Sequence, residues 1–141
     1  MSAQPHQPSA CVAPHGWEPC RSDEIFAIRV ERSRELLAQR ARMAFSPLER
    51  GIGLLNRERL DSDEALVIRS CSSIHTCFMR FPIDVVFIDR QWRVVATKRD
   101  LKPWRTAMVL WGAWSVIELP GGRLRNYPVS PGEHLSLTRE Q

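Results

Sequence analysis

The stretch Ser70–Asp89, SCSSIHTCFMRFPIDVVFID, carries the strongest structural signal in the chain. It ends in VVFID (Val85–Asp89), an apolar and β-branched run that is typical of a strand. A second such run, RVVATK (Arg93–Lys98), follows after the short connection Arg90–Trp92, and this arrangement predicts a β-hairpin. The earlier part of the stretch holds a histidine, two cysteines and an arginine, so residues that could carry chemistry adjoin the predicted hairpin.

Further strands are predicted on both sides of this hairpin. Ala65–Arg69 and Glu133–Leu137 have the composition of short strands, and residues 107–120 fit two short strands or a loop and a strand. Residues 25–44 fit either two strands or one amphipathic helix, and their pattern leaves both open. The many short strands indicate a mainly β fold, a compact and mostly antiparallel β-sandwich or half-barrel.

One short helix is predicted near residues 47–56. Ser46 is an N-cap candidate, Pro47 suits the first helical position, and Glu49 completes a capping box. Apolar residues then recur at helical spacing and form one stripe.

The length and composition are those of one globular domain. The chain has 141 residues, of which 43% are hydrophobic and 26% charged. Residues 1–22 hold four prolines and few large apolar residues, so we expect a flexible head before a single domain at 23–141. No apolar run approaches the roughly 20 residues that span a bilayer, and the first residues lack a secretory signal. We therefore expect a cytoplasmic protein with no membrane association.

The charge pattern argues against nucleic acid as a partner. The net charge is +4, and all but two of the 20 basic residues are arginines, the exceptions being Lys98 and Lys102. Acidic residues are interleaved with the arginines along most of the chain, and no uninterrupted basic tract occurs. Nucleic acid is therefore not an expected partner, and the oligomeric state is left open.

Four segments resemble domain-of-unknown-function family 192, also called uncharacterised protein family 127, which is widespread in bacteria and archaea. They are RGIGLL (50–55), SSIHTCFMRFPIDVVFIDR (72–90), LKPWR (101–105) and VIELPGG (116–122). The resemblance covers about residues 36–138. It implies a compact β-sandwich or half-barrel with little helix, and it implies no reaction, cofactor or partner.

The two cysteines of the opening stretch invite a metal or nucleophile hypothesis. Cys71, His75, Cys77 and Met79 would share one face of an extended chain, and this donor set would suit a soft metal. No CxxC motif occurs, and free cysteines are commonly buried as small apolar groups. We therefore predict neither a metal nor another cofactor, and whether Cys71 or Cys77 takes part in chemistry stays open.

The charged residues in the apolar stretch point to a ligand site. An unpaired charge in such a setting is costly, so Arg80 and Asp84 need each other, solvent or a ligand. They could form a structural pair around Pro82, or they could line a cleft in which Arg80 binds an anionic group. The predicted ligand-binding residues are His75, Arg80, Asp84, Trp104, Arg105 and Glu118.

Three functions follow from these residues. The first is a domain that binds a small anionic or carbohydrate-like molecule, or a peptide, near His75, Arg80 and Asp84. The second is a hydrolase-like enzyme that uses His75 with Asp84 or Glu118 in acid–base roles. The third is a structural or protein-interaction module without a pocket.

Overall fold

The computed structural model describes residues 24–44, 54, 57–69, 71–109 and 111–139. The predicted head at 1–22 lies outside them, and so does most of the predicted helix near 47–56. Leu54 is the part of that helix that is described, and it is helical and buried. Within the described residues, no helix is long and apolar enough to cross a membrane.

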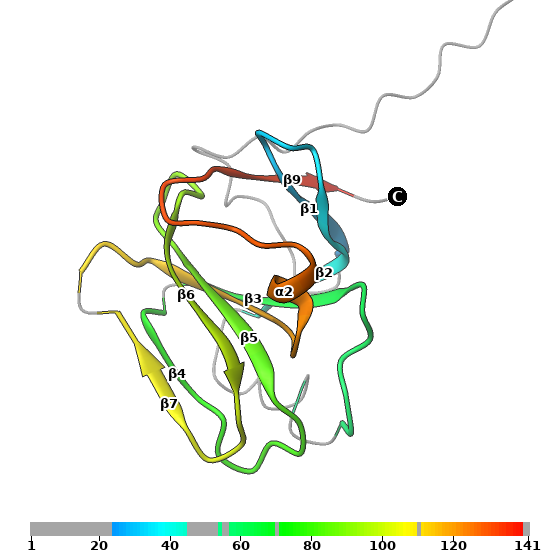
Figure 1. The fold of residues 1–141 in the computed structure, drawn as a ribbon, viewed down its shortest axis with the longest axis vertical. Helices are drawn as coiled ribbons and strands as arrows, with labels where there is room; N and C mark the ends of the chain where they lie inside the picture. The colour runs from blue at the N-terminus through cyan, green and yellow to red at the C-terminus, as the bar shows by residue number, and fades with distance from the viewer. Residues whose placement is uncertain (1–23, 45–53, 55–56, 70, 110, 140–141) are drawn as a thin grey trace, which may run out of the picture.

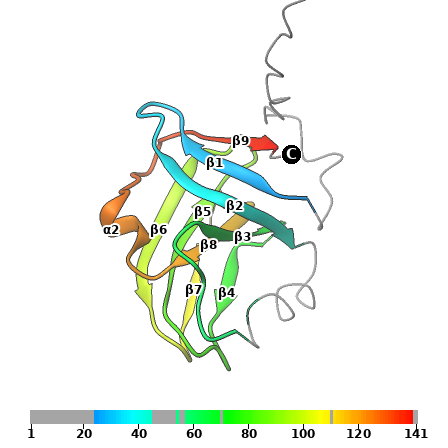
Figure 2. The ribbon, with the colours of Figure 1, turned by 90° about the vertical axis from the view of Figure 1, so that its right-hand side faces the viewer.

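Seven strands form the main sheet, which confirms the mainly β prediction. They are β1 (Phe26–Val30), β2 (Leu36–Ala44), β3 (Glu64–Arg69), β5 (Ile83–Ile88), β6 (Val94–Leu101), β8 (Ser115–Pro120) and β9 (Leu135–Arg139). Their order in the sheet is β6-β5-β8-β3-β2-β1-β9 (Figures 1 and 2). All neighbours are antiparallel except β2 and β3. Residues 25–44, for which a helix was an open alternative, form the two strands β1 and β2.

The main sheet curls until its two ends meet, as Figure 2 shows. Arg93, just before β6, forms an isolated antiparallel bridge with His134, just before β9. Close by, the N–H of Val94 donates to the carbonyl of Glu133 at 2.8 Å. The sheet is therefore a half-barrel, which leaves less of its edge strands unpaired.

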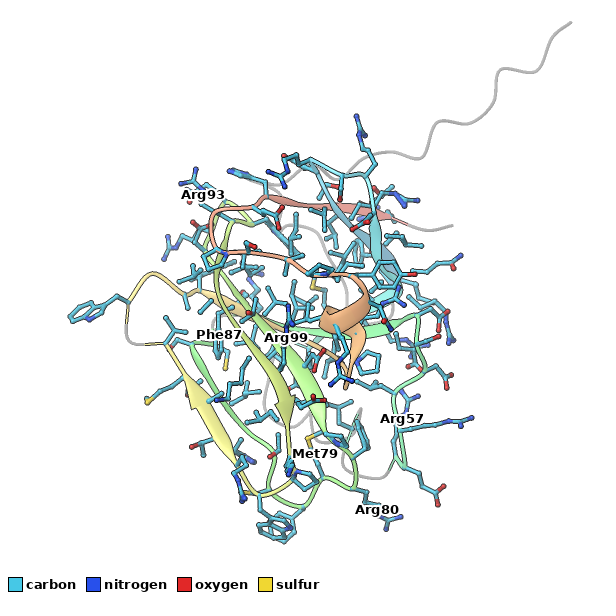
Figure 3. All side chains as sticks on the ribbon, in the orientation of Figure 1. Arg57, Met79, Arg80, Phe87, Arg93 and Arg99 are labelled. Carbon is cyan, nitrogen blue, oxygen red and sulfur yellow. The ribbon has the colours of Figure 1, made fainter. Side chains whose placement is uncertain are left out.

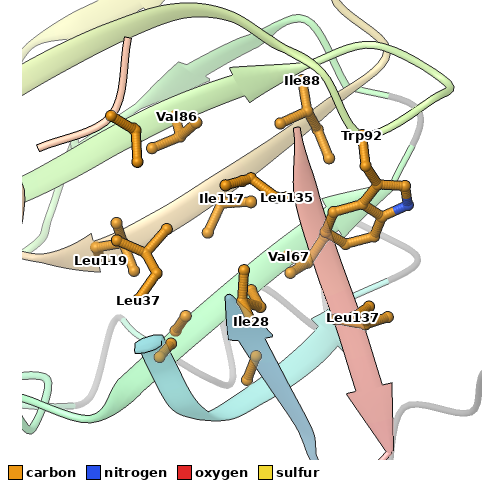
Figure 4. Packing of buried hydrophobic residues seen from close by; sticks show 14 of the residues in the cluster. Ile28, Leu37, Val67, Val86, Ile88, Trp92, Ile117, Leu119, Leu135 and Leu137 are labelled. Carbon is orange, nitrogen blue, oxygen red and sulfur yellow. The ribbon is translucent and has the colours of Figure 1, made fainter. Parts of the chain in front are cut away.

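Both faces of the sheet are covered by apolar side chains. One cluster lies inside the curl and includes Ile28, Trp92, Ile117 and Leu119 (Figure 4). A second cluster lies on the other face and includes Val85 and Phe87. Every residue of β5 is consequently buried, which explains the nearly continuous apolar run of Ile83–Ile88.

Two further strands stand apart from the main sheet, at the lower left of Figure 1. They are β4 (Ser73–His75) and β7 (Thr106–Met108), which pair antiparallel and which we call the β4–β7 ribbon. Ile74 faces inward and belongs to the second apolar cluster, with Ala107 packed against that cluster. On the opposite face the side chains are exposed, namely those of Ser73, His75, Thr106 and Met108.

Candidate functional site

Asp84 is completely buried and serves the fold. Its side chain is 0% exposed, and one carboxylate oxygen accepts the N–H of Asp100 at 2.9 Å while the other accepts the N–H of Leu124 at 2.7 Å. Asp100 lies in a bulge of β6, where an extra residue stands between the partners of Ile83 and Val85. Leu124 lies in the first turn of the helix α2 (Arg123–Asn126). Asp84 therefore links the bulge of β6 and the first turn of α2 to the strand β5 by hydrogen bonds.

Arg80 does not share a cleft with Asp84, contrary to our expectation. It is exposed in the loop between β4 and β5, and Figure 3 shows it at the lower end of the molecule, pointing away from it. Arg80 and Asp84 would share a face if the chain ran as one extended strand between them, because alternate residues of a strand lie on the same face. The chain instead turns between His75 and Ile83, so the two residues have no common face.

The predicted acid–base residues are also separated. Glu118 lies opposite Val85 and Asp84 lies opposite Leu119 in the pairing of β5 with β8, so the two carboxylates occupy opposite faces of the sheet. Glu118 is 0% exposed, as Asp84 is, whereas His75 is exposed on the ribbon. The structure therefore does not bring His75 together with either carboxylate at an open site.

Trp104 lies on the surface as part of an aromatic pair. Its ring contacts that of Phe78, with centroids 4.7 Å apart and ring planes tilted by 59°. Both residues adopt a left-handed backbone, with φ of 64° for Trp104 and 66° for Phe78. Bulky residues rarely take this conformation, and such strain is concentrated at binding sites. Phe78 was not among the binding residues predicted from the sequence. Its position, out of phase with the buried Met79 and Phe81, is the signal that could have indicated an exposed side chain.

Thr76 holds the two loops of this aromatic pair together. It is 0% exposed, and its hydroxyl donates to the carbonyl of Lys102 at 2.6 Å and accepts the N–H of Arg105 at 2.9 Å. Its own carbonyl accepts the N–H of Trp104 at 3.0 Å. The exposed rings of Phe78 and Trp104 are therefore presented by a backbone that is fixed from beneath.

An apolar and cationic surface surrounds the β4–β7 ribbon. All four large hydrophobic residues that are exposed in the described part of the chain lie in it or beside it: Phe78 (68% exposed), Trp104 (58%), Met108 (66%) and Trp111 (85%). The segments 71–82 and 101–114, which form the ribbon and its loops, contain no acidic residue. They contribute the exposed cations Arg80, Lys102 and Arg105. We call these seven residues the ribbon surface.

Two hollows of the described surface lie elsewhere, and none of the six predicted binding residues lines them. One is formed by residues 31–32 and 130–134. The other has a volume of about 340 Å³, and its lining includes Arg40 and the ion pair of Arg57 with Glu64. Arg40 also forms an ion pair with Asp63. The hydrogen bond from Arg57 lowers the pKa of Glu64 below its ordinary value, and that from Arg40 does the same for Asp63. The two acids that line this hollow, Asp61 and Glu64, thus each pair with an arginine, which favours a structural role.

The two cysteines of the ribbon region are both free thiols and half-buried. The thiol of Cys71 donates to the carbonyl of Ser73. Among the described residues, no group of three or more His, Cys, Asp or Glu side chains is placed to hold a metal ion.

Comparison with known proteins agrees with the fold. The model of the DUF192 family, described as Uncharacterized ACR, matches residues 28–137. A candidate transcription regulator from Sinorhizobium meliloti 1021 is 19% identical with a TM-score of 0.70, over 81% of this chain and 92% of that one. A protein of unknown function from Novosphingobium aromaticivorans DSM 12444 is 18% identical with a TM-score of 0.66, over 79% and 82%. No curated protein matches the chain. At these identities the two structures establish a common fold alone.

Proposed function

Since the chain belongs to the DUF192 family, whose description names no activity, we propose a function from the geometry of its surface. The protein is a docking domain that binds an acidic, partly apolar segment of another protein through the ribbon surface. This develops the expectation of binding near His75, Arg80, Trp104 and Arg105, while Asp84 and Glu118 are fully buried.

The observation that carries the proposal is that the four large exposed apolar side chains of the described residues all lie on the ribbon and its loops. Single exposed hydrophobic residues are ordinary, but several of them on one element, with cations beside them, indicate an interaction surface. Trp, Phe, Met and Arg are the residues enriched in protein interfaces, and Trp and Arg most often dominate binding energy. All four kinds occur on the ribbon surface.

The charges on the ribbon surface decide the chemistry of the partner. Arg80, Lys102 and Arg105 come from segments without any acidic residue, so a complementary partner carries carboxylates. Three cations are few for a nucleic-acid site, where each phosphate contact adds to affinity. The two hollows described above lie away from the ribbon, and small molecules usually bind in concave sites. A protein segment is therefore favoured over both alternatives.

The test is a selection from a peptide library. Peptides of about ten residues, alternating an apolar residue with Asp, Glu, Ser or Thr, are displayed on phage and selected on the immobilised protein. We expect acidic peptides to be enriched. Their Kd should rise about tenfold or more in the double variant Trp104→Ala/Arg105→Glu. Lys98→Glu, which makes the same change of charge at an exposed position of β6, should leave Kd unchanged.

Two results would overturn the proposal. One is that no peptide is enriched, or that the enriched peptides bind the double variant as tightly as the original protein. The other is that single-stranded oligothymidylate binds through Trp104 and Arg105 while the peptides do not, since the partner would then be nucleic acid.

A further inference from the structure

We infer that the bound segment adds to the fold as an extra β-strand along the outer edge of β7. This rests on the proposed function and specifies how the partner is held. Extended peptides commonly bind in this way, with main-chain hydrogen bonds giving affinity and alternate side chains giving specificity.

The register of the ribbon shows which backbone groups of β7 are turned outward. The ladder between the two strands is bounded by the bond from Val109 N–H to the carbonyl of Ser72, at 3.0 Å, and by the bond from Thr76 N–H to the carbonyl of Arg105, at 2.8 Å. In an antiparallel pair the hydrogen-bonded positions alternate with non-bonded ones. The bonded positions of β7 are therefore Arg105, Ala107 and Val109.

Thr106 and Met108 occupy the non-bonded positions, opposite His75 and Ser73. Their N–H and C=O groups therefore point away from β4. Within the described part of the chain, none of these four groups makes a hydrogen bond, and β7 pairs with no strand other than β4. A row of alternating free donors and acceptors at a sheet edge is a template for another strand.

The side chains beside this edge predict the sequence pattern of the added strand. Met108 and Thr106 point to the exposed face, so residues of the partner on that face would lie against Met108 and near the aromatic pair. The intervening residues would lie on the side of Ala107 and Arg105, of which Ala107 packs toward the second apolar cluster and Arg105 is exposed. A segment with apolar residues beside Met108 and Ala107 and an acidic residue beside Arg105 is therefore the expected occupant.

A second copy of the chain is a less suitable occupant. Pairing two β7 edges would bring together two surfaces that each carry Arg80, Lys102 and Arg105 and no acidic residue. Like charges across strands are unfavourable, so self-association opposes the electrostatics that favour an acidic partner.

The test removes one outward N–H without altering the ribbon. Thr106→Pro deletes a donor that does not bond β4, and proline is tolerated at such edge positions. Thr106→Val is the matched control, since it loses the same hydroxyl and keeps the N–H. With a peptide selected as above, we expect Kd to rise about tenfold or more in Thr106→Pro and to stay within about twofold in Thr106→Val.

Hydrogen exchange supplies a readout that needs no variant. The amides of Thr106 and Met108 should exchange quickly in the free protein and at least about tenfold more slowly with the peptide bound. If both variants bind equally and these amides stay unprotected while Trp104→Ala/Arg105→Glu still weakens binding, strand addition is refuted and the docking function stands. If binding does not depend on Trp104 and Arg105, the docking function itself fails.

Self-association is a separate outcome that would also overturn the inference. It would appear in sedimentation as a dimer of the free protein that Thr106→Pro converts to monomer and Thr106→Val does not. The edge would then be occupied by a second copy.

Discussion

Asp84 shows how a single charged residue is accommodated inside an apolar strand. Its two oxygens accept backbone N–H groups from Asp100 and Leu124, so each oxygen of the buried carboxylate has a main-chain donor in place of water. We predict that Asp84→Asn lowers the stability of the fold by about 2 kcal/mol, because the new amide presents an NH₂ group to a backbone donor. The measurement is the midpoint of denaturant unfolding.

The control for this variant is Asp100→Asn, which changes an exposed carboxylate that pairs with Arg125. It should move the unfolding midpoint far less. At a temperature where both variants are folded, peptide affinity should be unchanged. A loss of affinity in Asp84→Asn without a loss of stability would instead place Asp84 in the binding site.

Glu64 is the residue through which acid should weaken the fold. Arg57 donates two hydrogen bonds to its carboxylate and lowers its pKa below the ordinary 4.5. A carboxylate with a lowered pKa adds stability above its unfolded pKa, and this is lost as pH falls through the folded value. Glu64→Gln should therefore lose less stability than the original protein between about pH 5 and about pH 3. Equal losses, measured by denaturant unfolding at each pH, would refute this.

At the scale of elements, Thr76 joins the loop after β4 to the loop before β7. Thr76→Val keeps the shape of the side chain but leaves the carbonyl of Lys102 and the N–H of Arg105 without this hydroxyl. We predict a loss of about 1–3 kcal/mol in stability and a weaker peptide affinity, because Phe78 and Trp104 are then less firmly placed. Thr76→Ser retains the hydroxyl and should restore most of both. If Thr76→Val is destabilised but binds the peptide with unchanged affinity, peptide binding does not require these two loops to be held in place.

The sequence predicted the elements better than the site. The β5–β6 hairpin and the strand β3 follow from local composition, because each is a short apolar run bounded by turn residues. The ribbon depends on the pairing of residues 73–75 with 106–108, a contact between distant segments that no local pattern specifies. The burial of Asp84 has a similar origin, since its donors come from β6 and α2. Trp104 and Arg105 were predicted as binding residues from the sequence, and this stays a prediction, whereas Phe78, whose ring contacts Trp104, was not among the predicted residues.

At the scale of the whole molecule, the fold divides into a half-barrel and a small ribbon at its side. The acids near Arg40 and Arg57 are paired with these arginines, while the ribbon surface holds cations without any acidic residue in its own segments. The cations Arg80, Lys102 and Arg105 of the ribbon surface therefore contribute to the net charge of +4 and give this surface a positive character.

The docking interaction should consequently depend on salt. Between about 50 and about 500 mM NaCl, the Kd of a selected acidic peptide should rise severalfold, because salt screens exposed charges. Arg105→Gln should make this dependence shallower, and Lys98→Gln should leave it as it is. If the Kd, measured by calorimetry, does not change with salt, the cations of the ribbon surface do not contribute to peptide binding.

The most direct test of the docking function is to follow the amide and indole N–H signals by NMR while a selected peptide is added. We expect the indole signals of Trp104 and Trp111 to shift together with the backbone amide signals of Thr106 and Met108. If these signals do not shift, and the shifts are concentrated at residues 130–134 of the first hollow, the docking function is contradicted.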